Sequence, residues 1–185
     1  MTIKIEKWTI LSEESLVKTP IFVLHQVEAQ SQLDEQKKGK FVYFDVPAWV
    51  NVIALTKDRK VILVEQYRHG NREICLEIPG GMVDEGEDPL AAGLRELKEE
   101  AGGIGEQAEL IGVVDPNPAI QNNSCWTVLI HNVELFEQEL DPMEEIAIHL
   151  VDLEEISDMI RSGKIRHSLV VAAFHHLHLW QTKDL

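Results

Sequence analysis

The sequence contains little cysteine, little positive charge and no long apolar run. Its two cysteines, Cys75 and Cys125, are far apart and in no metal-ligand spacing, which argues against a disulfide framework and favours two reduced thiols. Residues 1–15 lack the apolar core of a signal peptide, and no run reaches the length of a transmembrane helix. We therefore expect a cytoplasmic protein that has no membrane partner.

The negative charge of the chain argues against nucleic acids and anionic membranes as partners. The chain has 32 acidic residues against 17 Lys and Arg, which gives a formal net charge of −15. Such a chain has no surplus of positive potential to attract DNA, RNA or an anionic membrane, so we expect no nucleic-acid partner. A phosphorylated ligand would need a divalent metal or a few well-placed arginines to offset its charge.

The two common phosphate-binding glycine loops are also missing. Gly80 and Gly81 are not followed by the Lys and Ser or Thr of a Walker loop. The next glycine is Gly86, which does not fit the G-x-G-x-x-G spacing of a dinucleotide fingerprint. Neither kind of nucleotide site is expected.

The chain does contain enough apolar sequence for one globular domain. Its 185 residues are 44% apolar, which suits a single domain with a buried core. Apolar runs rich in β-branched residues predict strands at 21–29, 41–46, 49–56, 60–67, 75–79, 108–114, 125–135 and 145–153, with a polar turn at 34–40. Helical patterns predict helices at 88–101, 153–164 and 167–181. This order of elements predicts an α+β fold with layers around one sheet.

The helix predicted over 88–101 carries a dense cluster of acidic residues. Asp88 suits the N-cap position and Gly102 ends the helix. Glu96 and Glu100 stand four residues apart and share a helix face, with Glu99 beside them. Such a cluster is either a solvated acidic face or a set of oxygen ligands for Mg²⁺ or Mn²⁺. Charge alone favours the solvated face.

The full spacing around this helix favours the metal ligands. It resembles the Nudix box, G-x5-E-x7-R-E-U-x-E-E-x-G-U, in which U is bulky and apolar. Eight positions match in register: Gly81, Glu87, Arg95, Glu96, Leu97, Glu99, Glu100 and Gly102. One position departs, because the last U is Gly103, followed by Ile104. That departure concerns the packing of the loop after the helix and not the metal ligands.

The resemblance implies a fold and a chemistry. The fold is the Nudix α/β/α sandwich with a mixed central sheet, and the activity is metal-dependent hydrolysis of a diphosphate joined to another group. The box would hold one to three Mg²⁺ or Mn²⁺ ions through Glu96 and Glu100. Glu99 is a further candidate ligand and catalytic residue, and the backbone carbonyl of Gly80 is expected to join them.

Four box residues are expected to shape the site without binding metal. By their positions in the motif, Glu87 and Arg95 would orient the helix and its glutamates. Gly81 and Gly102 are the fixed glycines at the two ends of the motif. All four are therefore predicted to be structural.

Segments outside the box are similar to hydrolases of ADP-ribose and other nucleoside diphosphate sugars. The run VEQYRHGNREICLEIPGG resembles theirs, with Arg68 reaching the terminal ribose or the phosphates and Glu77 reaching a sugar hydroxyl or bracing the box. Pro118 stands at the spacing after the box that is typical of the ADP-ribose subclass. Trp49 is a candidate contact for the base. A surface arginine, a rigid turn and a half-buried strand are the plain alternatives for Arg68, Pro118 and Trp49.

The general base is expected outside the box. The run LDPMEEIAIHLVDLEEI resembles the region of these hydrolases in which a loop glutamate activates water. Glu144 and Glu145 are both candidates, and the sequence does not choose between them.

The whole chain is predicted to be one Nudix domain, with an N-terminal β segment at about 1–46 and a catalytic core at about 47–185. In related enzymes the N-terminal segment forms a small separate sheet that builds a homodimer and contributes to the partner's site. The predicted function is hydrolysis of a nucleoside diphosphate sugar, such as ADP-ribose or GDP-mannose, to a nucleoside monophosphate and a sugar phosphate. A nucleoside triphosphate hydrolase of the same fold and a non-catalytic ADP-ribose sensor are the alternatives.

Overall fold

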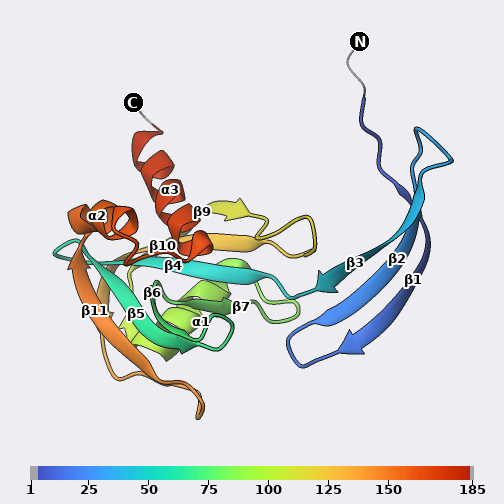
Figure 1. The fold of residues 1–185 in the computed structure, drawn as a ribbon. Coiled ribbons are helices and arrows are strands. Elements are labelled where there is room, and N and C mark those ends of the chain that lie inside the picture. The colour runs from blue at the N-terminus through green and yellow to red at the C-terminus, as the bar shows by residue number, and fades with distance from the viewer. Residues whose placement is uncertain (1–3, 184–185) are drawn as a thin grey trace. The chain divides into compact units, whose positions relative to one another are not determined.

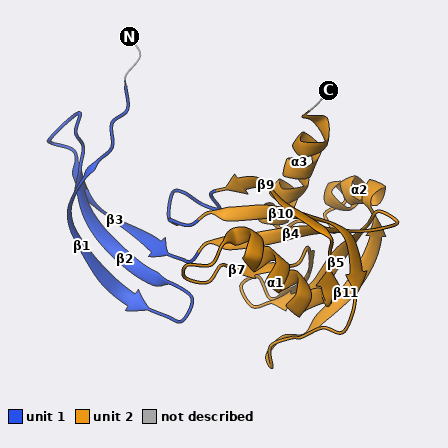
Figure 2. Ribbon diagram, turned by 180° about the vertical axis from the view of Figure 1, so that it is seen from behind, with its two compact units in different colours: residues 1–47, 115–123 blue, residues 48–114, 124–185 orange. Residues whose placement is uncertain are grey.

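The computed structural model describes residues 4–183, whose elements are labelled in Figure 1. These residues divide into two compact units, shown in Figure 2. Unit 1 contains the residues up to Pro47 together with Asp115–Asn123. Unit 2 contains Ala48–Val114 and the chain from Ser124 onward.

Unit 1 is built on a three-stranded antiparallel sheet in the order β1-β2-β3. Its strands are β1 (Thr9–Lys18), β2 (Val23–Gln30) and β3 (Lys38–Asp45). Strands β2 and β3 confirm those predicted near 21–29 and 41–46, but β3 begins inside the segment predicted as a turn. The sequence pattern misses β1 because TILSEESLVK does not alternate strictly between polar and apolar residues.

Unit 2 contains an eight-stranded mixed sheet. Strands β11, β5, β4, β10 and β8 run side by side in that order, while β6 pairs with β5, β7 with β4 and β9 with β10. The β4–β10 pair is parallel and the other pairs are antiparallel. The bounds are β4 (Trp49–Thr56), β5 (Lys60–Arg68), β6 (Glu73–Glu77), β7 (Gly80–Met82), β8 (Gly103–Ile104), β9 (Gln107–Val114), β10 (Cys125–Leu135) and β11 (Ile146–Asp152).

Helices cover both faces of this sheet, which confirms the predicted α/β/α sandwich (Figure 1). Helix α1 (Pro89–Ala101) packs against the face that carries Val50 and Val52 of β4. Helices α2 (Ile156–Arg161) and α3 (Ser168–Thr182) pack against the face that carries Ile53 and Leu55. The helix predicted over 153–164 is shorter in the structure, because Leu153–Glu155 form a 3-10 turn and α2 ends at Arg161.

Helix α1 begins and ends where its capping residues predict. The Asp88 side chain accepts a hydrogen bond from Leu90 N at 2.9 Å, and Gly102 adopts the left-handed conformation with φ 62°. The departure at Gly103 has a packing reason. A Cβ at this buried position would lie 2.8 Å from the Leu97 side chain, so the bulky residue of the family motif has no room here.

Candidate active site

Arg95 joins the box loop to helix α1. Its guanidinium donates to both oxygens of Glu87 at 3.0 Å and to the Met82 carbonyl at 2.9 Å. It also donates to Glu96 at 2.8 Å and to Glu99 at 3.0 Å. These three carboxylates hold the pKa of Arg95 above its ordinary value. Arg95 therefore fixes Glu87 in the loop and two glutamates of the helix relative to one another.

Gly81 makes room for the Glu96 carboxylate. A Cβ built on Gly81 would lie 2.4 Å from Glu96 Oε1 and 2.7 Å from Oε2, far inside van der Waals contact. Gly81 belongs to β7 and pairs with Val50 of β4, so its backbone cannot move away without disturbing the sheet. A glycine at this position lets Glu96 lie directly against the strand.

We expect Gly81→Ala to lower activity without unfolding the protein, because the added methyl group displaces the Glu96 carboxylate. A displacement of about 1 Å at a reacting centre can cost about 10²-fold in rate. Steady-state kinetics and thermal unfolding would measure the two effects separately. Gly39→Ala is the matched control, since a Cβ there meets Phe41 at an ordinary 3.4 Å. Equal activity of the two variants would contradict the assignment.

Glu100 is the most deeply buried acid of the box. It is 4% exposed, and its Oε2 accepts a hydrogen bond from Gly80 N at 2.9 Å. Burial raises the pKa of Glu100 to about 8, and the neighbouring charges of Glu96 and Glu144 add to the shift. Burial also raises the pKa of Glu96, although Arg95 partly offsets it. Desolvation therefore outweighs the nearby charges of Arg95 and Arg68 at these two carboxylates.

Gly80 presents its backbone to the same side as Glu100. It pairs with Asn51 in the antiparallel β4–β7 ladder, and the neighbouring pair carries the hydrogen bond from Val52 N to Pro79 O. Because hydrogen-bonded and non-bonded pairs alternate in such a ladder, the N–H and C=O of Gly80 point away from β4. The N–H donates to Glu100. The carbonyl at this position is thus directed out of the ladder toward the box.

The pKa of Glu100 implies that metal-free protein loses stability as the pH rises. Between the ordinary value of 4.5 and about 8, the folded protein holds a proton on Glu100 that the unfolded chain has released. The free energy of unfolding therefore falls across this window, by about 1.4 kcal/mol for each unit by which the pKa is displaced. Below the window both states are protonated and this loss is absent.

We expect Glu100→Gln to remove this dependence. Urea unfolding in a chelator, from about pH 5 to pH 9, should show the variant gaining stability relative to the parent as the pH rises. Glu99→Gln, which removes a half-exposed acid from the same helix, should follow the parent. Parallel curves for Glu100→Gln and the parent would contradict the burial argument.

The loop between β10 and β11 is attached to the end of α1. Phe136 N donates to Gly102 O at 2.8 Å, Glu139 N donates to Glu99 O at 2.9 Å, and the Gln138 amide donates to Glu100 O. These bonds carry the loop that contains Glu144 past the box. Gln138 holds this loop in place, and the sequence does not predict this because nothing in a single amide signals a contact 38 residues away.

The two candidate bases of this loop differ in their effect on the box, and the choice between them stays a prediction. The charge of Glu144 contributes to the raised pKa of both Glu96 and Glu100. The charge of Glu145 is not among the main causes of either shift. Both side chains are exposed, and Glu144 Oε2 also accepts from Asp141 N at 3.1 Å. Of this pair, only Glu144 is among the main causes of the two raised pKa values.

Arg68 and Glu77 form a two-pronged ion pair beside the box. Arg68 Nε lies 3.0 Å from Glu77 Oε1, and Arg68 Nη2 lies 2.8 Å from Glu77 Oε2. Glu77 is 2% exposed, so its charge is held almost entirely by this partner. The pKa of Arg68 is raised, chiefly by the hydrogen bonds to Glu77, and the charge of Glu100 adds to the effect.

A cavity of about 540 Å³ opens between this ion pair and the box glycines. Trp49 and Met82 line it on the β4–β7 side, and Leu169 lines it from α3. Asn51 and His167 also line it, and the sequence does not single out either because neither belongs to the motif. Pro118 lies in the part of the chain that belongs to unit 1, and its predicted contact with substrate stays a prediction.

Comparison with known proteins assigns this arrangement to a family. A family model described as the NUDIX domain matches residues 46–174, which include the box and both flanking segments. The chain belongs to the Nudix family. Its identification as a Nudix hydrolase from the spacing of the box is thereby confirmed.

Similarity within the Nudix family extends along almost the whole chain. An ADP-ribose pyrophosphatase of Bacillus subtilis (strain 168) is 28% identical over 174 residues, which cover 91% of this chain and 94% of the relative. A methanol dehydrogenase activator of Bacillus methanolicus is 31% identical over 175 residues, which cover 91% and 95%. A solved structure described as "Crystal structure of ADP compounds hydrolase" has a TM-score of 0.84 at 21% identity, with coverage of 99% and 98%, and shares the fold.

Nudix hydrolases generally need divalent metals such as Mg²⁺, and the residues of this box fit one. Among residues 4–183, no three His, Cys, Asp or Glu side chains already converge as a metal site. The donor chemistry is nevertheless suitable, because Glu96 and Glu100 are desolvated carboxylates with raised pKa values that a hard cation would relieve. Glu99 is more exposed and already paired with Arg95.

Proposed function

We propose that this Nudix hydrolase cleaves the diphosphate of nucleoside diphosphate sugars, with ADP-ribose as the first candidate, to a nucleoside monophosphate and a sugar phosphate. The observation that carries the proposal is the pair of buried Glu100 and partly buried Glu96 next to the Arg68–Glu77 cavity. The similarity along almost the whole chain to a relative named ADP-ribose pyrophosphatase supports the substrate class. The metal-binding box would hold the diphosphate, and the cavity would accept a group attached to it.

Glu96, Glu100 and the Gly80 carbonyl are the residues that we propose hold Mg²⁺ or Mn²⁺, with Glu99 as an additional ligand when more than one ion is bound. Bound metal would neutralise the diphosphate and lower the pKa of the attacking water. Arg95 keeps the glutamates oriented, and its own charge limits their repulsion. Bound metal ions would therefore let a chain with a net charge of −15 accept an anionic substrate.

Arg68 and Glu144 are the proposed contributions from outside the box. Nε and Nη2 of Arg68 donate to Glu77. Nη1 would then donate to a phosphate or to the ribose. Glu144 would take the proton from the attacking water, since its charge already acts on both box glutamates. Because displacement at phosphorus leaves little covalent work for the protein, positioning supplies most of the rate.

A substrate panel tests the proposal. The protein would be assayed with Mg²⁺ and with Mn²⁺ against ADP-ribose, ADP-glucose, GDP-mannose, UDP-glucose and the deoxynucleoside triphosphates. We expect a nucleoside monophosphate as product from at least one of the sugars. Release of pyrophosphate from triphosphates without activity on any sugar would assign the chain to the nucleoside triphosphate hydrolases instead. Tight ADP-ribose binding without turnover would make it a sensor.

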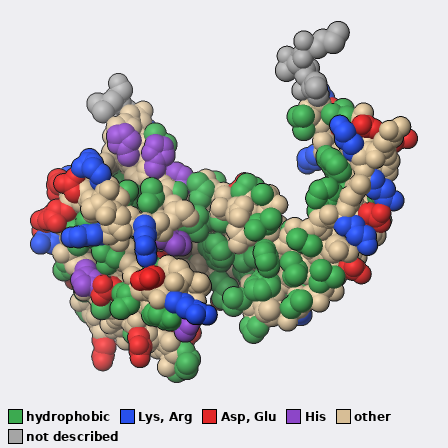
Figure 3. Space-filling view, viewed as in Figure 1, with side chains coloured by type: hydrophobic (Ala, Val, Ile, Leu, Met, Phe, Trp, Pro, Cys, Tyr) green, Lys and Arg blue, Asp and Glu red, His purple; other side chains and the backbone are tan. Residues whose placement is uncertain are grey.

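The surface of unit 1 supports the proposal of a homodimer. All ten residues of β1 are exposed, including Ile10, Leu11, Leu16 and Val17. Phe41 of β3 is also exposed, and Figure 3 shows hydrophobic side chains gathered over this sheet. A sheet with this much open apolar surface is typical of an interface. The proposed partner is a second copy in the cytoplasm, whose unit 1 would contribute to the active site, and a single-chain mass by light scattering would exclude it.

In the part of the chain that the structure describes, no helix is long and apolar enough to cross a membrane.

A further inference from the structure

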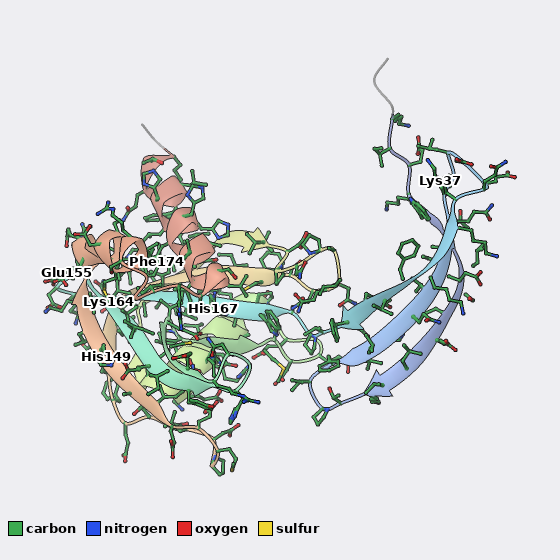
Figure 4. The ribbon with its side chains drawn as sticks, viewed as in Figure 1. Lys37, His149, Glu155, Lys164, His167 and Phe174 are labelled. Atoms are coloured by element: carbon green, nitrogen blue, oxygen red, sulfur yellow. The ribbon has the colours of Figure 1, made fainter. Side chains whose placement is uncertain are left out.

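Strand β5 continues beyond the end of its ladder with β11. The ladder joins all of β11, including His149 (Figure 4), to β5 and stops at the pair Ile146–Gln66. Strand β5 goes on to Tyr67 and Arg68, which pair with β6. Residues 64–66 pair with both β6 and β11, so these two strands lie on opposite sides of β5. Among residues 4–183, no strand pairs with Tyr67 and Arg68 on the β11 side.

The chain that enters β11 leads directly into this open stretch. Because the pairing is antiparallel, one more pair would place Glu145 opposite Tyr67, and the next would place Glu144 opposite Arg68. The Gln138 amide donates to Ile146 O and so fixes the start of β11, while the loop from 139 to 145 stays outside the ladder. An extension of β11 therefore needs no change in the register that already exists.

This register decides which of the two glutamates faces the box. Paired residues carry their side chains on one face of the sheet, and neighbours along a strand alternate between the faces. Ile148 pairs with Val64 and packs against the core that contains α1. Arg68 is four residues after Val64 and lies on the same face. Glu144 would thus join Arg68 on the side of α1, whereas Glu145 would lie on the other side.

A turn holds Glu144 outside the ladder in the structure. Its N–H donates to Asp141 O at 2.9 Å, and its Oε2 accepts from Asp141 N at 3.1 Å. Both residues are exposed, so water competes for these two hydrogen bonds and each contributes little net stability. Replacing the turn by two more pairs of the ladder exchanges exposed hydrogen bonds for others of the same kind.

Apolar side chains favour the extended strand. Met143 is 93% exposed and Tyr67 is 47% exposed. By the alternation along a strand, Met143 would share the face of Glu145 and therefore of Tyr67. Diagonal neighbours on adjacent strands are within reach of long and aromatic side chains, and a methionine sulfur contacts aromatic rings favourably. Extension would remove part of both side chains from water.

We propose that residues 143–145 extend β11 along β5 during the reaction, and that Tyr67 and Met143 are positioning residues that hold Glu144 beside Arg68 on the side of the box. The inference rests on the proposed function, in which Glu144 takes the proton from the attacking water. It assigns a task to two exposed apolar side chains that lie outside the box and outside the metal-binding set.

Kinetics of Met143→Ser and Tyr67→Ser test the positioning role on the sugar nucleotide that the wild type hydrolyses fastest. We expect kcat to fall about fivefold and KM to stay unchanged, since one good cross-strand contact is lost. In a Glu144→Gln background the same substitutions should cost less than about twofold, because no base is left to position. Met143 is almost fully exposed, so Met143→Ser should unfold at the wild-type temperature.

Hydrogen exchange observes the strand itself. The protein would be compared alone and with Mg²⁺ and the α,β-methylene analogue of that sugar nucleotide, whose bridge cannot be hydrolysed. We expect the amides of 143–145 to exchange more slowly in the complex, and Met143→Ser to reduce this protection. Leu150→Ser is the matched control, because it removes an exposed apolar side chain from the part of β11 that is already paired. It should retain both kcat and the protection.

Three results would overturn the inference. The first is wild-type kcat in both Met143→Ser and Tyr67→Ser. The second is a loss of the same factor with and without Glu144→Gln, which would show a merely structural effect. The third is unchanged exchange of 143–145 in the complex. Each of these, obtained with an active wild type, leaves the proposed function standing. A wild type that hydrolyses no nucleoside diphosphate sugar would refute the proposed function and this inference with it.

Discussion

Glu100→Gln should lower kcat/KM for the preferred nucleoside diphosphate sugar by about 10³-fold or more while the protein stays folded. The substitution keeps the size of the side chain and retains an oxygen that can accept from Gly80 N. It removes the one charge that the buried site can offer to a cation at this position. A loss of this size corresponds to about 4 kcal/mol of transition-state stabilisation.

The metal dependence of the variant separates loss of binding from loss of chemistry. If Glu100 is a ligand, the Mg²⁺ concentration that gives half-maximal rate should rise, and saturating Mn²⁺ should restore part of the activity. Glu99→Gln is the matched control, because Glu99 is on the same helix but half exposed and paired with Arg95. Its loss should be clearly smaller. Wild-type turnover by Glu100→Gln would contradict the metal assignment.

The sequence predicts the box because the motif is local. Asp88, Gly102 and the spacing between them define α1, and helical geometry then places Glu96 and Glu100 on one face. The sequence also predicts the ion pair between Arg95 and Glu99, because the two residues stand four positions apart on one helix. It does not predict that Arg95 holds Glu96 as well, because that contact depends on Gly81 and on the path of β7 across β4.

Contacts between distant segments are what the sequence does not predict. The choice between Glu144 and Glu145 depends on how Gln138 and Glu139 attach their loop to the end of α1. Asn51 and His167 line the same cavity because the side chain of Asn51 lies on the face of β4 that α3 covers. The hydrophobic pattern of neither segment predicts that the two residues line one cavity.

The N-terminal sheet illustrates a different limit. Hydrophobic pattern identifies a strand by the face that it buries, and β1 buries neither face within the described chain. Its sequence has pairs of polar and apolar residues instead of an alternation. Likewise, Pro118 lies in Asp115–Asn123, which belongs to unit 1 although the chain on both sides of it belongs to unit 2, so its role rests on the family spacing.

Glu144→Gln should reduce kcat by about 10²–10⁴-fold, the contribution of a general base, and should leave KM nearly unchanged. The reason for choosing Glu144 is that its charge is among the causes of the raised pKa of both Glu96 and Glu100. Glu145→Gln is an unusually close control, since it removes the same charge from the next residue of the same exposed loop. It should retain most of the activity.

The pH dependence distinguishes a base from a residue that only positions the loop. Removing a general base should flatten the acidic side of the kcat–pH profile, whereas a disturbed loop lowers kcat at every pH and leaves the profile unchanged. Glu144→Asp, which keeps the carboxylate on a shorter arm, should restore part of the rate. A larger loss in Glu145→Gln than in Glu144→Gln would assign the base to the other residue. If both variants keep the acidic limb of the kcat–pH profile, the base lies outside this loop. Glu99 would then be the next residue to test.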